Sequence, residues 1–251
     1  MITLASDFGS PYPAAMKGVL LQRTDARLVD VAHDFPRQDV RAAAFWLREV
    51  LPYFPPAVHL VVVDPGVGTD RAAVVVRAGE HALVGPDNGV LLPAARALAE
   101  KFEVFEYGYE DPASATFHGR DVFAPAAARV HEAGVADLET IEDVTPVDEY
   151  VDLAFPEPVV RADGARGEVL VTDDFGNAIT NVPGSVLDGR VGESVTVDGE
   201  SVPVRRAYAA VDPGERLVTV GSHGNVELAV NQGRGAAAFD LAVGDAVALS
   251  W

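Results

Sequence analysis

Four short segments of the sequence group polar side chains that can bind a ligand or transfer a proton. They are residues 6–9 (SDFG), 64–71 (DPGVGTDR), 116–125 (TFHGRDVFAP) and 173–177 (DDFGN). The first two directly follow apolar runs that have the character of buried strands. Ligands bind beyond the carboxyl ends of the strands in an open α/β sheet, so these segments predict a site at one edge of a sheet.

The second segment contains a carboxylate and a guanidinium at the two ends of one loop. Asp64 ends the apolar run 59–63, Pro65 and Gly66 form a turn, and Arg71 closes the loop. An aspartate and an arginine placed in this way can pair through two parallel hydrogen bonds, which holds the carboxylate in one orientation. The alternative is a salt bridge that only fastens the loop.

Two further side chains suit catalysis and ribose binding. His118 precedes Gly119 at the start of an expected helix, where its imidazole is accessible and titrates near neutral pH. Its alternative role is a helix-entry histidine that bonds a neighbouring carbonyl. Asp7 follows the first strand, and its two acceptor oxygens match the two hydroxyls of a ribose. An aspartate in this position is also a common helix cap.

The fourth segment lies in the second half of the chain. The Asn177 amide can bind the donor and acceptor edge of a base or an amino acid, and Phe175 can stack on a purine. The alternative is an Asx-type hairpin turn. Residues 85–89 (GPDNG) indicate chiefly a turn. The sequence has no G-x-G-x-x-G or P-loop and no metal-ligand spacing of histidines, which argues against NAD, ATP and zinc sites.

The elements that must position these groups change in character along the chain. The first half predicts strands at 2–5, 27–32, 59–63, 73–77, 82–84 and 103–107, and helices at 14–23, 40–51, 91–101 and 122–132. The continuous apolar run 59–63 is typical of a strand that is buried on both faces of a parallel sheet. Alternating strands and helices predict an α/β layered domain with a mostly parallel sheet.

The second half favours short strands. Residues 136–158 are acidic and contain prolines without a sustained period, so we interpret them as a linker. From residue 159 onward, apolar stretches alternate with turn signals, which predicts a small β-barrel or sandwich. We therefore expect an N-terminal α/β domain at 1–150 and a C-terminal β-barrel domain at 157–251, with a boundary near residue 155.

The composition narrows the classes of partner. The 251 residues carry 38 acidic and 19 basic side chains, a formal net charge of −19, and 49% of them are hydrophobic. This charge disfavours nucleic acid and anionic membranes, and its even spread predicts a salt-adapted, halophilic source. The chain has no cysteine, signal-peptide pattern or membrane-length apolar run, so we expect a cytoplasmic protein without disulfides.

Taken together, the segments resemble one family. SDFG, VVDPGVGTDR, GPDNGVL, FHGRDVFAP and DDFGNAITN occur in this order, and a more diffuse match includes Tyr208 and residues 222–231. Each motif is weak alone, but the series is similar to the S-adenosylmethionine (SAM) hydroxide adenosyltransferases, relatives of the fluorinase and chlorinase enzymes. The resemblance implies an N-terminal α/β domain, a C-terminal β-barrel and a homotrimer with SAM bound between neighbouring subunits.

The resemblance also implies roles for individual residues. The catalytic set that it implies is Asp64, Arg71 and His118, and Asp7 matches the carboxylate that holds the ribose diol. The other substrate-binding residues that it implies are Phe8, Phe117, Asp173, Phe175, Asn177, Tyr208, Ser222 and Asn231. The halogenating relatives differ, because they have Tyr where Asp64 stands and Tyr-Ser where His118-Gly119 stands. Gln38 replaces an aromatic residue of the fluorinase type beside the substrate.

The implied reaction is hydrolysis of SAM to adenosine and L-methionine, with no metal or organic cofactor. Water must be oriented and must lose a proton, and either His118 or Asp64 can accept that proton. One alternative is a halide-dependent SAM adenosyltransferase, which a carboxylate beside the nucleophile disfavours because it repels an anion. Another alternative is a sensor that binds SAM or adenosine without turnover. The water-activating groups argue against it, because a protein that only binds its ligand does not need them.

Overall fold

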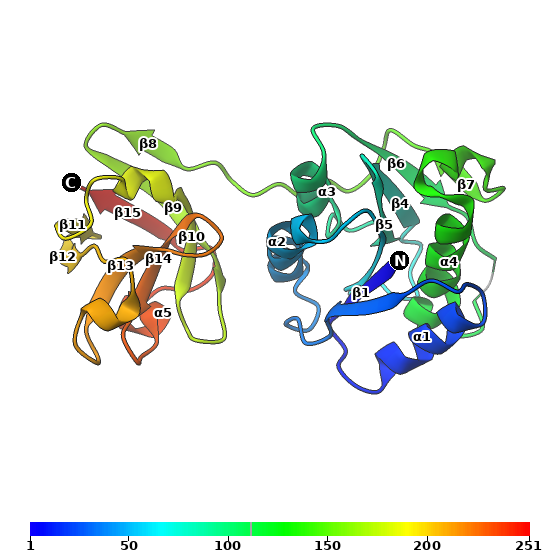
Figure 1. Ribbon diagram of the computed structural model, residues 1–251, viewed down its shortest axis with the longest axis horizontal. Coiled ribbons are helices and arrows are strands. Elements are labelled where there is room, and N and C mark those ends of the chain that lie inside the picture. Colours follow the sequence, from blue (N-terminus) through cyan, green and yellow to red (C-terminus); the bar gives the residue numbers. More distant parts are fainter. Residues whose placement is uncertain (111) are drawn as a thin grey trace. The chain divides into compact units, whose positions relative to one another are not determined.

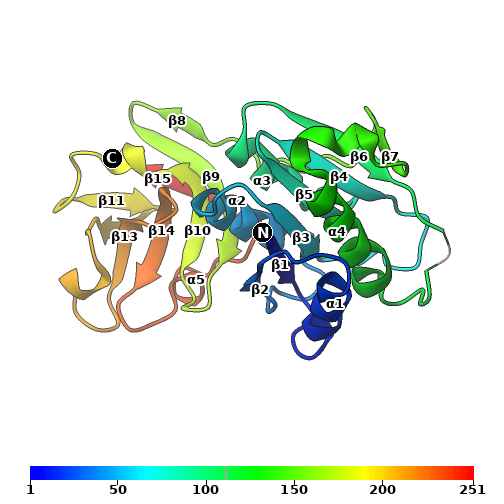
Figure 2. The same ribbon diagram turned by 45° about the vertical axis from the view of Figure 1, so that its right-hand side comes forward.

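A computed structural model describes residues 1–110 and 112–251 of the chain. The structure divides into two compact units, Met1–Ala154 and Phe155–Trp251. The first unit is an α/β domain and the second consists almost entirely of short strands, as the sequence analysis predicts (Figures 1 and 2).

The first unit is built on a seven-stranded sheet in the order β2-β1-β3-β5-β4-β6-β7. The strands are β1 (Ile2–Ser6), β2 (Leu28–Ala32), β3 (Val58–Val62), β4 (Ala73–Ala78), β5 (His81–Pro86), β6 (Phe102–Tyr107) and β7 (Val144–Pro146). The pairs from β2 to β5 are parallel, whereas β4 pairs antiparallel with both β5 and β6. The sheet is therefore mostly parallel, because β6 again points the same way as β1, β2, β3 and β5.

Helices cover both faces of this sheet. They are α1 (Tyr12–Leu21), α2 (Val40–Val50), α3 (Leu92–Leu98) and α4 (Ala124–Ala133). Helices α1 and α4 pack together on one face, and α2 and α3 pack on the other (Figure 1). Helix α2 begins where the sequence predicts, because the Asp39 side chain accepts a hydrogen bond from the Ala42 amide at 2.9 Å. A five-residue π-helix, Gly119–Phe123, precedes α4 and includes the first two residues of the expected helix at 122–132.

The interpretation of residues 136–158 as one linker is wrong in its first part. A 3-10 helix, Val135–Thr140, is followed by β7, which extends the sheet by pairing antiparallel with β6. Leu138, Ile141 and Val144 are buried and join the core of this unit. Three isolated apolar residues among acidic ones produce no sustained period, so the sequence does not reveal these short elements.

The second unit is a nearly closed antiparallel barrel. Its main path is β12-β11-β15-β9-β10-β14-β13, and β8 pairs with β9. The strands are β8 (Val159–Arg161), β9 (Gly164–Thr172), β10 (Ala178–Pro183), β11 (Ser194–Val197), β12 (Glu200–Pro203), β13 (Arg216–Val220), β14 (Asn225–Val230) and β15 (Ala246–Ser250). A bridge between Val204 and Val218 joins the two ends of the path, and buried valines and leucines fill the interior.

The remaining elements are short. They are the 3-10 helices Leu51–Tyr53, Gly184–Leu187 and Tyr208–Ala210, and the four-residue helix α5, Gly235–Ala238. Among the described residues, no helix combines the length and the apolar character that crossing a membrane requires.

Candidate active site

The predicted catalytic segments meet at the carboxyl ends of β1 and β3. Strand β1 lies between β2 and β3, so the chain leaves β1 on one side and returns on the other. This reversal is the topological switch point at which open α/β sheets bind ligands. Ser6 pairs with Val62 at this edge, so Asp7 and Asp64 follow neighbouring strand ends.

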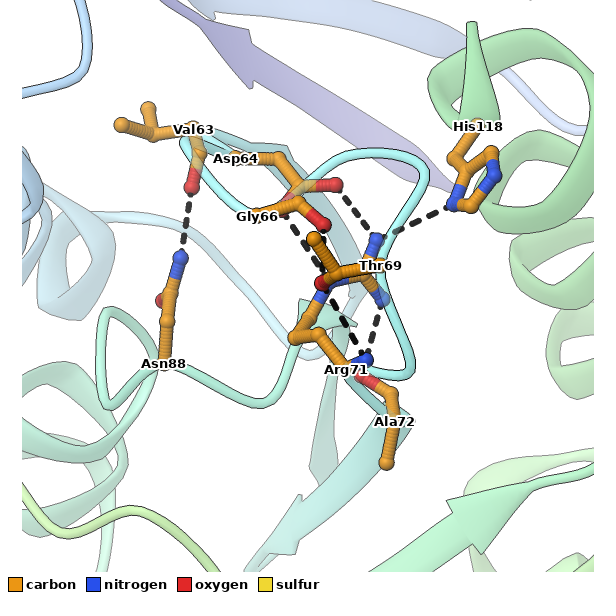
Figure 3. Close-up of polar contacts among 8 residues, drawn as sticks. All are labelled: Val63, Asp64, Gly66, Thr69, Arg71, Ala72, Asn88 and His118. Carbon is orange, nitrogen blue, oxygen red and sulfur yellow. Dashed lines mark hydrogen bonds and ion pairs between the residues drawn. The ribbon is translucent and has the colours of Figure 1, made fainter. Parts of the chain in front are cut away.

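Arg71 holds Asp64 and His118 together (Figure 3). Its Nε and Nη2 donate to the two carboxylate oxygens of Asp64 at 3.0 and 2.5 Å. The same Nη2 lies 3.2 Å from Nδ1 of His118. Nη1 donates to the Ala72 carbonyl at 2.8 Å, and the guanidinium lies 5.0 Å from the centre of the Phe123 ring. The bidentate pairing that the sequence suggests is therefore present, and it extends to the histidine.

Two glycines allow these segments to approach one another. Gly68 has φ +79°, and a Cβ atom there would lie 2.7 Å from the Ala115 carbonyl oxygen. A Cβ atom on Gly119 would lie 2.9 Å from the sulfur of Met16. Side chains at these positions would separate the Asp64–Arg71 loop and the His118 segment from their neighbours, which accounts for glycine in both motifs.

The cluster is buried, so the expectation of an accessible His118 imidazole is wrong for the single chain. Burial sets the electrostatics of the cluster. The exposed fractions of the Asp64 and Arg71 side chains are 5% and 8%, and His118 is 3% exposed. Burial, and then the nearby Arg71 guanidinium, lowers the pKa of His118 below its ordinary value of 6.5. His118 is therefore neutral at pH 7. Arginine has no acceptor atom, so Nδ1 must accept the Arg71 hydrogen bond, and the imidazole proton resides on Nε2.

Asn88 is a member of the site that the sequence indicates only as part of a turn. Its Nδ2 donates to the Val63 carbonyl at 2.9 Å, and its Oδ1 accepts from the Val90 amide at 3.1 Å. The side chain thus fixes the backbone directly before Asp64 (Figure 3). The neighbouring Asp87 accepts a hydrogen bond from the Val151 amide at 2.9 Å.

The residues predicted to bind the ribose end lie on the α1 side of this edge. Asp7 is 8% exposed, and its Oδ2 accepts the Gln38 amide at 2.6 Å. Phe8 and Phe117 form an edge-to-face contact with ring centres 6.1 Å apart, and Tyr12 packs edge-on against both. Asp7 therefore has a defined orientation, and the two phenylalanines are brought together as expected.

The predicted residues of the barrel lie in the turns and loops between its strands. Asp173 and Asn177 close the β9–β10 turn, where Asp173 accepts hydrogen bonds from the Asn177 amide and side chain at 2.8 and 3.0 Å. Phe175 at the tip is 80% exposed. Ser222 is exposed, and Asn231 donates from its side chain to the Val211 carbonyl at 2.8 Å. A hairpin turn is thus present, but the Asp173 side chain bonds the amide four residues on rather than two residues on as in an Asx turn. The one large apolar side chain of this turn projects outward.

Tyr208 has a partner that the sequence analysis does not identify. Its hydroxyl donates to Oε1 of the buried Glu227 at 2.6 Å, and His223 lies 3.5 Å from the other carboxylate oxygen. Burial and then this hydrogen bond raise the pKa of Tyr208, so the phenol stays protonated. Nineteen positions separate Tyr208 from Glu227, which is why a local motif does not reveal the pair.

Within residues 1–110 and 112–251, no group of three or more His, Cys, Asp or Glu side chains is arranged to hold a metal ion.

The fold and the site define a class of two-domain proteins. An α/β domain carries an Asp-Arg-His cluster at its switch point, and an antiparallel barrel follows in the same chain. The chain belongs to the SAM hydroxide adenosyltransferase family, because the model of the N-terminal domain matches residues 2–142 and that of the C-terminal domain matches residues 167–248. The resemblance found in the sequence is thereby confirmed.

Relatives and solved structures agree with this membership. The chain is 43% identical to a protein of Salinispora tropica over 97% of this chain and 95% of that protein. It is 44% identical to a protein of Thermus thermophilus over 97% of both, and each relative is named (R)-S-adenosyl-L-methionine hydrolase. A crystal structure of an uncharacterized conserved protein from Thermotoga maritima matches with TM-score 0.85 and 33% identity, covering 100% of both chains. A conserved hypothetical protein from Thermus thermophilus matches with TM-score 0.80 and 41% identity, covering 99% of this chain and 98% of that one.

Proposed function

We propose that this chain hydrolyses S-adenosylmethionine to adenosine and L-methionine. The observation that carries the proposal is the buried contact of Arg71 with both Asp64 and His118, in a chain whose relatives are named (R)-S-adenosyl-L-methionine hydrolase. Those names further suggest that the (R) epimer at sulfur is a substrate.

In the reaction, the water oxygen forms a bond to the 5′ carbon while the bond between that carbon and sulfur breaks. The electron pair of the broken bond goes to sulfur, which leaves as neutral methionine, and one proton of the water must be released. The positive sulfonium is already a good leaving group, so we expect no metal or organic cofactor, and SAM is the substrate. The protein's task is to orient the water and accept its proton.

We assign the proton acceptor to Asp64. His118 accepts from Arg71 through Nδ1, so its other nitrogen, Nε2, already carries a proton and can only donate. Asp64 is fixed by two hydrogen bonds from Arg71, and each carboxylate oxygen keeps a lone pair for a water molecule. His118 Nε2–H then orients the water oxygen, and Arg71 fixes both partners.

The substrate-binding roles complete the proposal. Asp7 holds the ribose hydroxyls, and Phe8 and Phe117 line the pocket beside it. The barrel residues that we assign to the nucleoside and methionine ends are Asp173, Phe175, Asn177, Tyr208, Ser222 and Asn231. The outward Phe175 supports a role in contacting a ligand, because an 80% exposed phenylalanine stabilises nothing within its own barrel.

We further propose a homotrimer whose active sites lie at subunit interfaces. The support is that the assigned residues are divided between the two units of the chain, with Asp7, Asp64 and His118 in one and Phe175 and Asn177 in the other. Light scattering should give the mass of a trimer, and a fully active monomer would contradict this assembly.

The experiment that tests the activity is incubation of the protein with the separate (R) and (S) epimers of SAM, followed by chromatography. Adenosine and methionine in equal amounts are expected. A 5′-halo-5′-deoxyadenosine formed in the presence of chloride would favour a halide transferase. Unchanged SAM together with measurable binding would favour a sensor.

A further inference from the structure

A second chain of polar side chains lies beside Asp7 and takes no part in the mechanism described above. The Ser6 hydroxyl is 2.7 Å from Nδ1 of His33, and Nε2 of His33 is 2.9 Å from Oδ1 of Asp30. Lys17 on α1 donates to the other oxygen of Asp30 at 2.6 Å. The chain thus runs from an exposed ion pair to a hydroxyl that is fully buried.

The ionised state of Asp30 fixes the direction of the hydrogen bonds that it makes. Burial opposes ionisation of Asp30, but hydrogen bonds from Lys17 and His33 outweigh it and lower the pKa of this carboxyl. Ionised Asp30 can only accept, so Nε2 of His33 donates to it. Nδ1, on the other side of the ring, bonds the Ser6 hydroxyl and fixes it next to Asp7 in one rotamer.

The same residues are those of a serine hydrolase triad, but they cannot perform its chemistry. Ser6 is 0% exposed, so no substrate carbonyl can reach its hydroxyl. This series of hydrogen-bonded side chains therefore has a different role, which the surrounding backbone indicates.

Three contacts join the end of β1 and the loop that follows it to the loop after β2. They are the Ser6–His33 hydrogen bond, the bond from the Gly9 amide to the His33 carbonyl at 2.8 Å, and the bond from the Gln38 amide to Asp7 Oδ2 at 2.6 Å. Gln38 has φ +62°, and this uncommon backbone conformation directs its amide toward Asp7. Contacts between the two loops must hold Gln38 in this conformation. His33 is the residue through which two of the three contacts pass.

We propose that Ser6, His33 and Asp30 are positioning residues that hold the Asp7 carboxylate in the orientation that binds the ribose hydroxyls. This inference rests on the proposed function, in which Asp7 is the ribose anchor. Fixed supporting hydrogen bonds keep a binding group within a fraction of an ångström of its productive geometry. The network therefore sets selectivity for a ribonucleoside over a 2′-deoxyribonucleoside.

The test measures the Kd of adenosine and of 2′-deoxyadenosine by calorimetry for the intact protein and its variants. Ser6→Ala removes the buried hydroxyl, and His33→Gln removes the ring that spans Ser6 and Asp30. In both variants the Kd of adenosine should rise on the order of ten-fold, the lower bound for one hydrogen bond to a charged group, whereas the Kd of 2′-deoxyadenosine should stay within about two-fold. The KM for SAM should rise in parallel with little change in kcat.

Two further variants separate positioning from general damage. His33→Asn keeps a polar group near the place of Nδ1 and should restore part of the ribose preference. His131→Gln, on α4, is the matched control and should bind both nucleosides as the unmodified protein does. Thermal melts of each variant identify any that fail to fold.

The outcomes distinguish this proposal from the proposed function. If the unmodified protein prefers adenosine and the folded Ser6→Ala and His33→Gln variants keep that preference, the positioning role is overturned while the activity stands. If the unmodified protein binds both nucleosides equally, the role of Asp7 as ribose anchor fails, and the positioning role fails with it.

Discussion

Replacement of Asp64 by asparagine separates the charge of this carboxylate from its shape. Asp64→Asn preserves one acceptor oxygen for Arg71 but removes the negative charge and the capacity to accept a proton. General base contributions are about 10²- to 10⁴-fold, so kcat for SAM hydrolysis should fall by that factor with little change in KM.

The same change has a predictable effect on stability. Asp64 and Arg71 are 5% and 8% exposed, so the variant leaves a buried cation without its counter-charge. Removing one partner of a buried pair costs about 3–5 kcal/mol, and the oxygen that asparagine retains places the expected loss near the lower figure. At about 2–4 °C per kcal/mol for a protein of this size, the melting temperature should fall by roughly 10 °C.

The assay is initial-rate formation of adenosine together with a thermal melt, at a temperature where all variants are folded. Asp70→Asn is the matched control, because it removes an exposed aspartate of the same loop and should alter neither quantity. Arg71→Lys is the second variant, since it keeps the cation but cannot contact Asp64 and His118 together. A folded Asp64→Asn protein that retains a third or more of kcat would refute the assignment of Asp64 as the base.

Three other perturbations follow from the charges of the protein. Because the pKa of His118 is lowered, kcat should be constant from about pH 6.5 to 8. It should fall only at more acid pH, where protonation of His118 breaks the contact between His118 and Arg71. A kcat that still increases as the pH is raised through 6.5 would contradict this. Burial and the neighbouring His81 lower the pKa of His59 to about 3, so the folded state binds fewer protons and the free energy of unfolding should fall as pH drops from 6.5 toward 3, by at most about 1.4 kcal/mol per pH unit. Urea titrations at several pH values give the free energy of unfolding, and its dependence on pH should be weaker for His59→Gln than for the unmodified protein. An equal pH dependence in the two proteins would exclude His59 as the cause. The net charge of −19 predicts a melting temperature that rises as salt shortens the Debye length from about 10 Å at 0.1 M to about 3 Å at 1 M, whereas an unchanged value would show that the acidity is incidental.

The sequence predicts the features that depend on local pattern. The buried run at β3 and the Pro-Gly turn after it place Asp64 at a strand end, and the loop to Arg71 is short enough to make their pairing predictable. The apolar faces of α1, α2 and α4 likewise indicate helices within a few residues of their observed bounds.

Features that depend on distant partners are not predictable in this way. Strand β7 lies where it does because β6 offers an edge, and the sequence from 144 to 146 has no pattern of its own. His33 reaches Ser6 across 27 positions, and Asn88 reaches Val63 across 25. These contacts exist only because parallel pairing brings strand ends together, so the supporting residues of the site require the three-dimensional structure.

In the proposed reaction, water is the nucleophile at the 5′ carbon of SAM. The most direct measurement is turnover of SAM in water enriched in ¹⁸O, at high chloride concentration, with mass spectrometry of the nucleoside product. Attack by water yields adenosine that carries one ¹⁸O atom, at the 5′ oxygen. Adenosine without the label, or 5′-chloro-5′-deoxyadenosine as the main product, would contradict it.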